Sequence, residues 1–286
     1  MRKHGRKLKK QRRVIIGITF CMLFLLTVGY AAFQTHITIT AEGNIKEKSR
    51  VIQKWTYNNQ ADFHADYYRE NIVSVTFLDN ASVPTNATES WDVSEDKKGG
   101  VIAYVIPNNE DSTKYDLYIG AQDGVIANSY SAYLFNGFTS VTKINFNDNF
   151  DTSNVTTMYS MFKKAAIKEI DLTSFNTGKV TDMNTMFGEC ANLEKITFGD
   201  FDTSNVIDMR GMFWLCTSLT ELDLTSFNML NTTSMRAMFM SCENLTKVNL
   251  CSFNTQNVTT MQDMFSGTTN LEIITVGEEW TTENAN

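Results

Sequence analysis

The apolar positions of the chain recur with a period of 25 or 26 residues from residue 150 onwards. A Phe opens each unit, a Met follows eight residues later, and a Met-Phe pair comes three residues after that Met. The opening residues are Phe150, Phe175, Phe201, Phe227 and Phe253, and the Phe residues of the pairs are Phe162, Phe187, Phe213, Phe239 and Phe265. Five units that agree at all these columns indicate an internal repeat.

Each unit predicts two structural elements. The Met and Met-Phe positions are three and four residues apart, which fits one or two turns of helix. The segments that follow end in an apolar-x-apolar alternation typical of a half-buried strand, and they span residues 193–198, 219–224, 245–250 and 271–276. One unit cannot bury its apolar side alone, so we expect the units to stack. The predicted fold class is an α/β solenoid, a leucine-rich-repeat-like stack of coils with a parallel β-sheet.

The region before the repeats has a different pattern. Residues 71–79, 101–106 and 115–120 are rich in β-branched and aromatic residues and are bounded by turn signals, which predicts strands. A stack of repeats exposes apolar edges at its ends, so we assign this region to a cap. The predicted organisation is a spacer over 34–70, a β-rich N-terminal cap with a partial repeat over 71–149, five repeats over 150–280 and a polar tail over 281–286.

Residues 1–33 combine a basic run with an apolar segment. Residues 1–13 carry eight Lys or Arg, and residues 14–33 are largely apolar. A helix of that length rises about 30 Å, the thickness of the hydrocarbon core. We predict a hydrophobic helix that is either a cleaved signal peptide or a retained membrane anchor with a cytoplasmic N-terminus. Both alternatives place the remaining chain at the cell surface or in the extracellular space.

The net charge of the chain limits the classes of partner that it can bind. Removing the eight N-terminal cations from the 25 Lys and Arg leaves 17 against 32 Asp and Glu. A surface this acidic repels phosphate backbones, so we expect no nucleic-acid partner. The hydrophobic content of 42% argues against disorder.

Cysteine and methionine usage follows the repeat. Cys190, Cys216 and Cys242 are each 26 residues apart, which does not resemble the clustered spacing of metal sites. We predict a buried thiol ladder, and a disulfide between adjacent units stays open as the alternative. The repeated Met residues are assigned to packing against Phe rather than to copper, and the Asn-bearing turns to stacked turns rather than to calcium. We expect no cofactor and no metal.

The outward positions of the predicted strands form the candidate ligand face. One column alternates in charge and the next column is polar. The eight residues are Glu169, Asp171, Lys195, Thr197, Glu221, Asp223, Lys247 and Asn249. Opposite charges on neighbouring strands also support strand register by a few tenths of a kcal/mol, roughly, so a solvated face without a ligand is the alternative interpretation.

The motifs of the repeat and of the cap together resemble a known family. The repeat "FDTSNVTTMYSMF" with its C-x-x-L-x-x-L-x-L continuation, and the preceding "YRENIVSVTFLD" and "SWDVSEDKKGGVIAYV", closely resemble BspA-family leucine-rich repeat surface proteins of Gram-positive bacteria and mycoplasmas. The resemblance covers roughly residues 67–280. It implies an exported or surface-attached protein involved in adhesion, and it supplies no catalytic residues. The chain departs from wall-anchored relatives because it has no C-terminal L-P-x-T-G signal.

Three functional hypotheses follow. The leading one is a noncatalytic extracellular protein that binds a protein or glycan partner through its repeat face, with membrane attachment through residues 14–33 if that segment is uncleaved. The second is an exported cell-wall hydrolase, for which His64, Asp66 and Glu70 are a candidate trio. The third is a structural surface protein that associates with its own copies.

Overall fold

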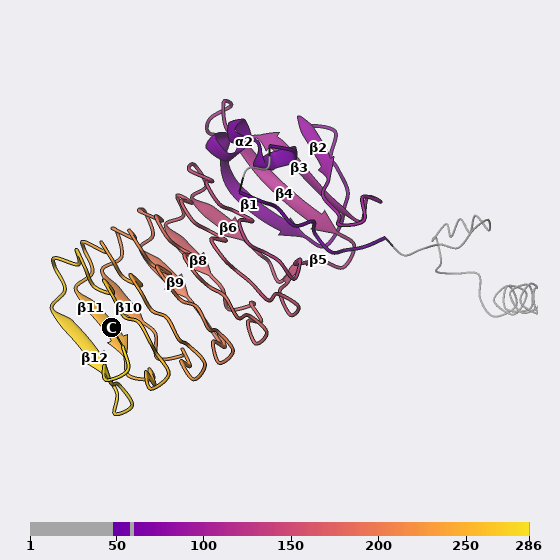
Figure 1. Cartoon of the computed structure of the whole chain (residues 1–286). Coiled ribbons are helices and arrows are strands. Elements are labelled where there is room, and N and C mark those ends of the chain that lie inside the picture. The colour runs from indigo at the N-terminus through magenta and orange to yellow at the C-terminus, as the bar shows by residue number, and fades with distance from the viewer. Residues whose placement is uncertain (1–47, 58–59, 286) are drawn as a thin grey trace, which may run out of the picture. The chain divides into compact units, whose positions relative to one another are not determined.

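The computed structural model describes residues 48–57 and 60–285, which belong to one compact unit of the chain (Figure 1). The hydrophobic helix predicted at residues 14–33 lies outside the described residues. Among the residues that are described, none of the helices has both the length and the apolar character needed to cross a bilayer.

The N-terminal part of the described chain builds a five-stranded sheet in the order β2-β3-β4-β1-β6. Strand β3 is antiparallel to both β2 and β4, whereas β1 is parallel to both β4 and β6. The three strands predicted before the repeats are confirmed as β1, β3 and β4. The elements of this region are η1 (Asp62–His64), α2 (Asp66–Asn71), β1 (Ile72–Leu78), β2 (Glu89–Asp92), β3 (Val101–Pro107), β4 (Tyr115–Ala121), β5 (Val125–Ile126), β6 (Lys143–Asn145) and β7 (Phe150–Asp151).

The described part of the predicted spacer packs onto this sheet. Ile52, Trp55 and Phe63 are buried, and the Ile52 N–H donates to the Ile126 carbonyl over 2.9 Å. Removing these apolar side chains from water is favourable in free energy, so the segment packs against the core instead of remaining extended in solvent. This region therefore differs from the expected spacer, because it contributes to the core.

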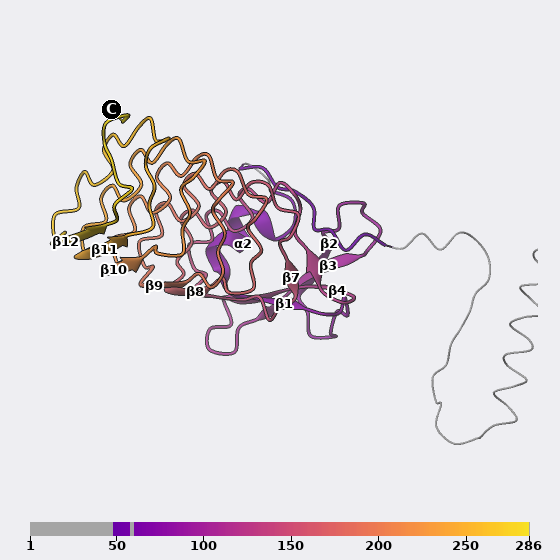
Figure 2. The ribbon, with the colours of Figure 1, turned by 90° about the horizontal axis from the view of Figure 1, so that it is seen from below.

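Four of the five repeat strands lie in the segments that alternation predicted. The five strands are β8 (Glu169–Asp171), β9 (Lys195–Thr197), β10 (Glu221–Asp223), β11 (Lys247–Leu250) and β12 (Ile273–Val276). Strand β8 occupies the equivalent position one unit earlier, where Glu169 and Asp171 were predicted to face outward. Figure 2 shows these strands following one another along one side of the ribbon. Their ladders are interrupted, however. Strands β8 and β9 form one parallel pair, β10, β11 and β12 form a separate three-stranded parallel sheet, and β5 and β7 form another pair.

The predicted helix of each unit is wrong. In the first repeat, every second N–H donates to a carbonyl of the following unit, and the N–H groups of Met161 and Lys163 between them donate to the carbonyl three residues back. The cross-unit bonds run from Met158 to Asp182, from Ser160 to Asn184, from Phe162 to Met186 and from Lys164 to Gly188, over 2.9–3.0 Å. Ser160 and Lys164 have left-handed backbones, with φ of 51° and 64°. An α-helix needs right-handed residues and bonds to the fourth residue back, so this segment is a series of turns.

The predicted α/β solenoid with leucine-rich-repeat geometry and one continuous parallel sheet is therefore wrong. Within the described residues, helix is confined to η1 and α2, which both precede the repeats, and the strands fall into four separate sheets. The repeat strands are only three or four residues long. Much of the remaining hydrogen bonding between units comes from the turn segments instead of from a sheet.

The core of the repeats is built from equivalent side chains of successive units. The rings of Phe162, Phe187, Phe213, Phe239 and Phe265 follow one another at centroid distances of 5.2–5.9 Å, with planes within 11° of parallel. The Met residues at 158, 183, 209 and 235 are fully buried beside them. Offset stacking of this kind adds to the free energy gained from burying each ring.

The buried thiol ladder is confirmed. Cys190, Cys216 and Cys242 are buried and unpaired. Each Sγ–H donates to a carbonyl of the preceding unit, those of Phe162, Phe187 and Phe213, over 3.0–3.1 Å. Burial raises the pKa of Cys190 and of Cys242 to about 12 and raises that of Cys216 well above its usual value. These thiols are thus held in the protonated, unreactive form.

Candidate functional site

The eight predicted face residues lie on four repeat strands and point away from the core. Strand β8 carries Glu169 and Asp171, and β9 carries Lys195 and Thr197. The same positions on β10 and β11 hold Glu221, Asp223, Lys247 and Asn249. All are exposed except Asn249, which is half-buried. The residue between each pair is buried on β8, β10 and β11, as Ile170 is, and half-buried on β9 (Ile196), and it holds its strand with the two neighbours directed outward.

Strand register places opposite charges side by side. Glu169 is directly opposite Lys195 in the β8–β9 pair, and Glu221 is directly opposite Lys247 in the β10–β11 pair. The Lys247 Nζ lies 3.2 Å from Glu221 Oε1. Because β9 and β10 belong to different sheets, the structure groups the eight residues into two sets of four and not into one continuous ladder.

A groove runs over β6, β8 and β9. Its volume is about 730 Å³. It contains four of the eight predicted residues, together with side chains from the partial repeat. The lining residues are Thr142, Lys143, Ile144, Asn145, Lys168, Glu169, Ile170, Asp171, Glu194, Lys195 and Thr197. Three Lys and three acidic residues thus share one open surface, which suits a partner that presents its own charged or hydroxyl groups.

The sequence prediction missed Lys143, Lys168 and Glu194. Lys143 lies on β6 and precedes Ile144 just as Glu169 precedes Ile170. The partial repeat was recognised from its apolar residues, so reading the same column one unit earlier would have found Lys143. Lys168 and Glu194 lie just before β8 and β9, outside the alternating triplet, and no periodic signal marks them.

The two columns of the face differ in how firmly the backbone holds them. The Asp171 carboxylate accepts the Thr173 N–H over 2.9 Å, and equivalent bonds join Asp223 to Thr225 and Asn249 to Cys251. The backbone and hydroxyl of Thr173 lower the pKa of Asp171, and Lys195 adds to this effect. On β8, β10 and β11 the second column therefore closes the turn after the strand, whereas the column of Lys143, Glu169 and Lys195 is more available to a partner.

A family comparison assigns the repeats. The family described as "Mycoplasma protein of unknown function, DUF285" matches residues 131–197 and 195–286, which together make up more than half of the chain. The chain belongs to this family. The DUF285 match begins in the partial repeat and runs through all five repeats, so it includes β6 and the whole candidate face. No curated protein and no solved structure matches the chain.

The assignment agrees with the resemblance drawn from the sequence at a coarse level, because both point to a protein family of mycoplasmas. Kinship with BspA-family proteins is a finer statement than the DUF285 match makes. Strands β1–β4 precede the matched residues. The remaining candidate residues, His64, Asp66 and Glu70, also lie in that preceding part of the DUF285 chain.

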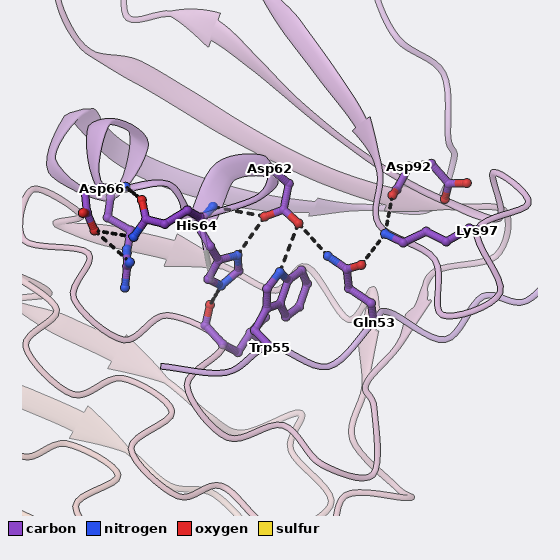
Figure 3. Close-up of polar contacts among 10 residues, drawn as sticks. Gln53, Trp55, Asp62, His64, Asp66, Asp92 and Lys97 are labelled. Carbon is purple, nitrogen blue, oxygen red and sulfur yellow. Dashed lines mark hydrogen bonds and ion pairs between the residues drawn. The ribbon is translucent and has the colours of Figure 1, made fainter. Parts of the chain in front are cut away.

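His64 is buried in a polar network in that part (Figure 3). Its Nδ1 lies 3.1 Å from Asp62 Oδ1, and its Nε2 lies 2.7 Å from the Leu134 carbonyl oxygen. Asp62 Oδ2 also accepts hydrogen bonds from Gln53 Nε2 over 2.6 Å and from Trp55 Nε1 over 3.2 Å. Burial lowers the pKa of His64, and the Asp62 carboxylate opposes that effect.

The structure does not assemble His64, Asp66 and Glu70 as a trio. His64 faces Asp62, whereas Asp66 Oδ1 accepts from Arg69 Nη2 over 2.9 Å. Asp66 and Glu70 line a separate groove of about 240 Å³ that His64 does not reach. Within residues 48–57 and 60–285, no group of three or more His, Cys, Asp or Glu side chains is placed to hold a metal ion.

Proposed function

We propose that this DUF285 protein is a noncatalytic surface protein that binds an extracellular protein or glycan through the strand face of its repeats. The strand face is defined by the outward charged residues of five strands, Lys143, Glu169, Lys195, Glu221 and Lys247. Its kinship with BspA-family surface proteins, and export through residues 14–33 as a signal peptide or anchor, are parts of the same proposal.

The observation that carries the proposal is the charge pattern of the groove over β6, β8 and β9. Lys143, Glu169 and Lys195 follow one another in alternating sign, each on its own strand and each exposed. Exposed pairs of this kind contribute little to stability, so stability alone does not account for the pattern. Arrays of both signs favour one partner and reject others by like-charge contact.

The geometry also favours an extended partner over a small molecule. The groove is open and is lined by side chains from several strands instead of being enclosed by apolar walls. Small-molecule sites are usually concave and mostly apolar. A protein surface or a glycan chain could contact successive strands through many weak contacts, which add together when they are joined in one ligand.

The test is a double charge reversal on the groove. The variant Lys143→Glu with Lys195→Glu should lose binding to immobilised host-matrix proteins or to glycan arrays by about tenfold or more, because two of the three cations of the groove become acids. The matched control is Lys54→Glu with Lys179→Glu, which changes the same charge at exposed positions off the strand face. Equal binding by the groove variant and the parent would place the site elsewhere.

A further inference from the structure

Strand β12 is an apolar edge strand. It is the last strand of the β10-β11-β12 sheet, and all four of its residues are exposed. The exposed fractions are 45% for Ile273, 44% for Ile274 and 42% for Val276. Three large aliphatic side chains within four residues make this edge the densest exposed apolar segment among the described strands.

The same positions are buried in the earlier units, except that Ile196 on β9 is half-buried. Ile170, Leu222 and Val248 occupy the column of Ile274, and their exposed fractions are 4%, 6% and 0%. Leu224 and Leu250 occupy the column of Val276 and are fully buried. In the earlier units these side chains are covered by the unit that follows. The exposure of β12 is therefore a property of its place at the edge and not of the sequence pattern.

The backbone of β12 also indicates an edge that can accept another strand. In the earlier units the residue in the column of Val276 donates its N–H to the next unit, as Leu172 does to Thr197 over 2.8 Å and Leu224 does to Asn249 over 3.0 Å. On β12 this column faces the open edge of the sheet. An open edge with alternating donors and acceptors is a template for an added strand.

The charge of the residues around β12 indicates which kind of polypeptide segment would bind to this edge. Residues 248–286 contain five acids and no Lys, Arg or His, the acids being Asp263, Glu272, Glu278, Glu279 and Glu283. The cation beside β12 is Lys247 on β11, opposite Ile273, and its Nζ lies 3.2 Å from Glu221 Oε1. A second copy joined edge to edge would set two such acidic ends against each other, which is unfavourable. A cationic segment would be attracted to the same end.

We propose that β12 is a docking edge for an extended, basic segment of a partner protein. The segment adds as a strand, so its backbone pairs with that of Ile274 and Val276 while its alternate apolar side chains continue the row of Val248 and Ile274. Its Lys or Arg side chains lie near Glu272 and Glu278. This surface is separate from the strand face, and the two proposals can fail independently.

The experiment measures binding of a synthetic peptide of alternating Lys and Val to the purified full chain by fluorescence anisotropy. We expect binding that weakens as salt rises, and at least tenfold weaker binding of the peptide with Glu in place of Lys. The variants Ile274→Asn and Glu272→Lys with Glu278→Lys should each weaken binding about tenfold. Ile207→Asn and the double variant Glu70→Lys with Glu110→Lys are matched controls, because they make the same changes at exposed positions away from β12 and off the strand face.

Hydrogen exchange distinguishes strand addition from loose electrostatic attraction. Bound peptide should slow exchange of the Ile274 and Val276 amides and leave those of β8 unchanged. Equal binding of the Glu peptide, or full binding by the β12 variants, would overturn the proposal. Sedimentation that shows a dimer abolished by Ile274→Asn would also overturn it, because a second copy would then occupy the edge.

Discussion

The buried thiols show how one position is used in the same way by successive units. Cys190, Cys216 and Cys242 each fill a small buried position and donate to a carbonyl of the preceding unit. Cys251 is exposed, and it follows the end of β11. The four thiols therefore differ in access although all belong to the repeats.

Thiol labelling of the native chain should separate these positions. Thiolate is the reactive form, so the raised pKa of Cys190 and Cys242, about 12, keeps both unreactive even at pH 9. We expect iodoacetamide to modify Cys251 rapidly and to leave Cys190, Cys216 and Cys242 unmodified until denaturant is added, as read by peptide mass spectrometry. Rapid native modification of Cys216 would contradict the buried ladder.

At this scale the sequence predicted much of the core and part of the site. The Phe and Met columns could be predicted because each apolar residue recurs at a fixed spacing and has few alternatives to burial. The outward residues of β8–β11 followed from alternation around one buried residue, such as Ile170. Lys168 and Glu194 could not be predicted, because they flank the strands and their approach to the groove depends on how neighbouring units pair.

Among the elements, the short η1 segment has the largest concentration of buried polar contacts described in the N-terminal part. Asp62 has a left-handed backbone with φ of 58°, and its carboxylate accepts from Gln53, Trp55 and the His64 backbone N–H. Through His64 the same network reaches the Leu134 carbonyl in the partial repeat. One carboxylate thus joins the N-terminal segment, through His64, to a turn of the partial repeat.

Replacing this carboxylate should destabilise the protein. Asp62→Asn keeps a residue type that tolerates the left-handed backbone but removes the negative charge and replaces one of the two acceptor oxygens by an NH2 donor, so that part of the buried donors lose their acceptor. We expect a loss of about 2 kcal/mol in the free energy of unfolding, measured by urea denaturation. Asp66→Asn is the matched control, since its carboxylate is mostly exposed and should have a smaller effect. Equal losses in the free energy of unfolding for the two variants would show that the buried network around Asp62 adds no more stability than an exposed carboxylate does.

The helix prediction failed at the scale of the element for a clear reason. Met and Phe spaced three and four residues apart fit a helical face, but they fit a turn segment with a left-handed residue every fourth position equally well. Each repeat has two such positions four residues apart, and glycine occupies them only at Gly211 and Gly267, whereas other repeats have residues such as Ser160 there. Cross-unit hydrogen bonds decide the conformation, and a single unit read alone does not contain them.

Over the whole described chain, the units differ in how well their neighbours cover them. Met209 and Phe213 in the third repeat are fully buried, whereas their equivalents in the last repeat, Met261 and Phe265, are half-buried. Trp280 covers part of the last unit by stacking near Phe253, with ring centroids 6.5 Å apart. The last unit therefore has packing on only one side.

Hydrogen exchange should follow this difference. We expect amides in residues 255–285 to exchange at least tenfold faster than the cross-unit amides of the central repeats, such as that of Phe187, because partial opening of the last unit breaks fewer contacts. Native-state exchange followed by mass spectrometry measures both in one sample. Uniform exchange across the repeats would show that they open as one cooperative block.

The parallel pairing of β1 with β6 has a consequence for how the chain is made. Strand β1 emerges from the ribosome long before the repeats, and β6 adds to it at Ser74, Val75 and Thr76. Each later unit then meets a neighbour that has already left the exit tunnel. The repeats of a nascent chain can thus pair in the order of their translation. Strand β1 provides the first surface on which this pairing begins.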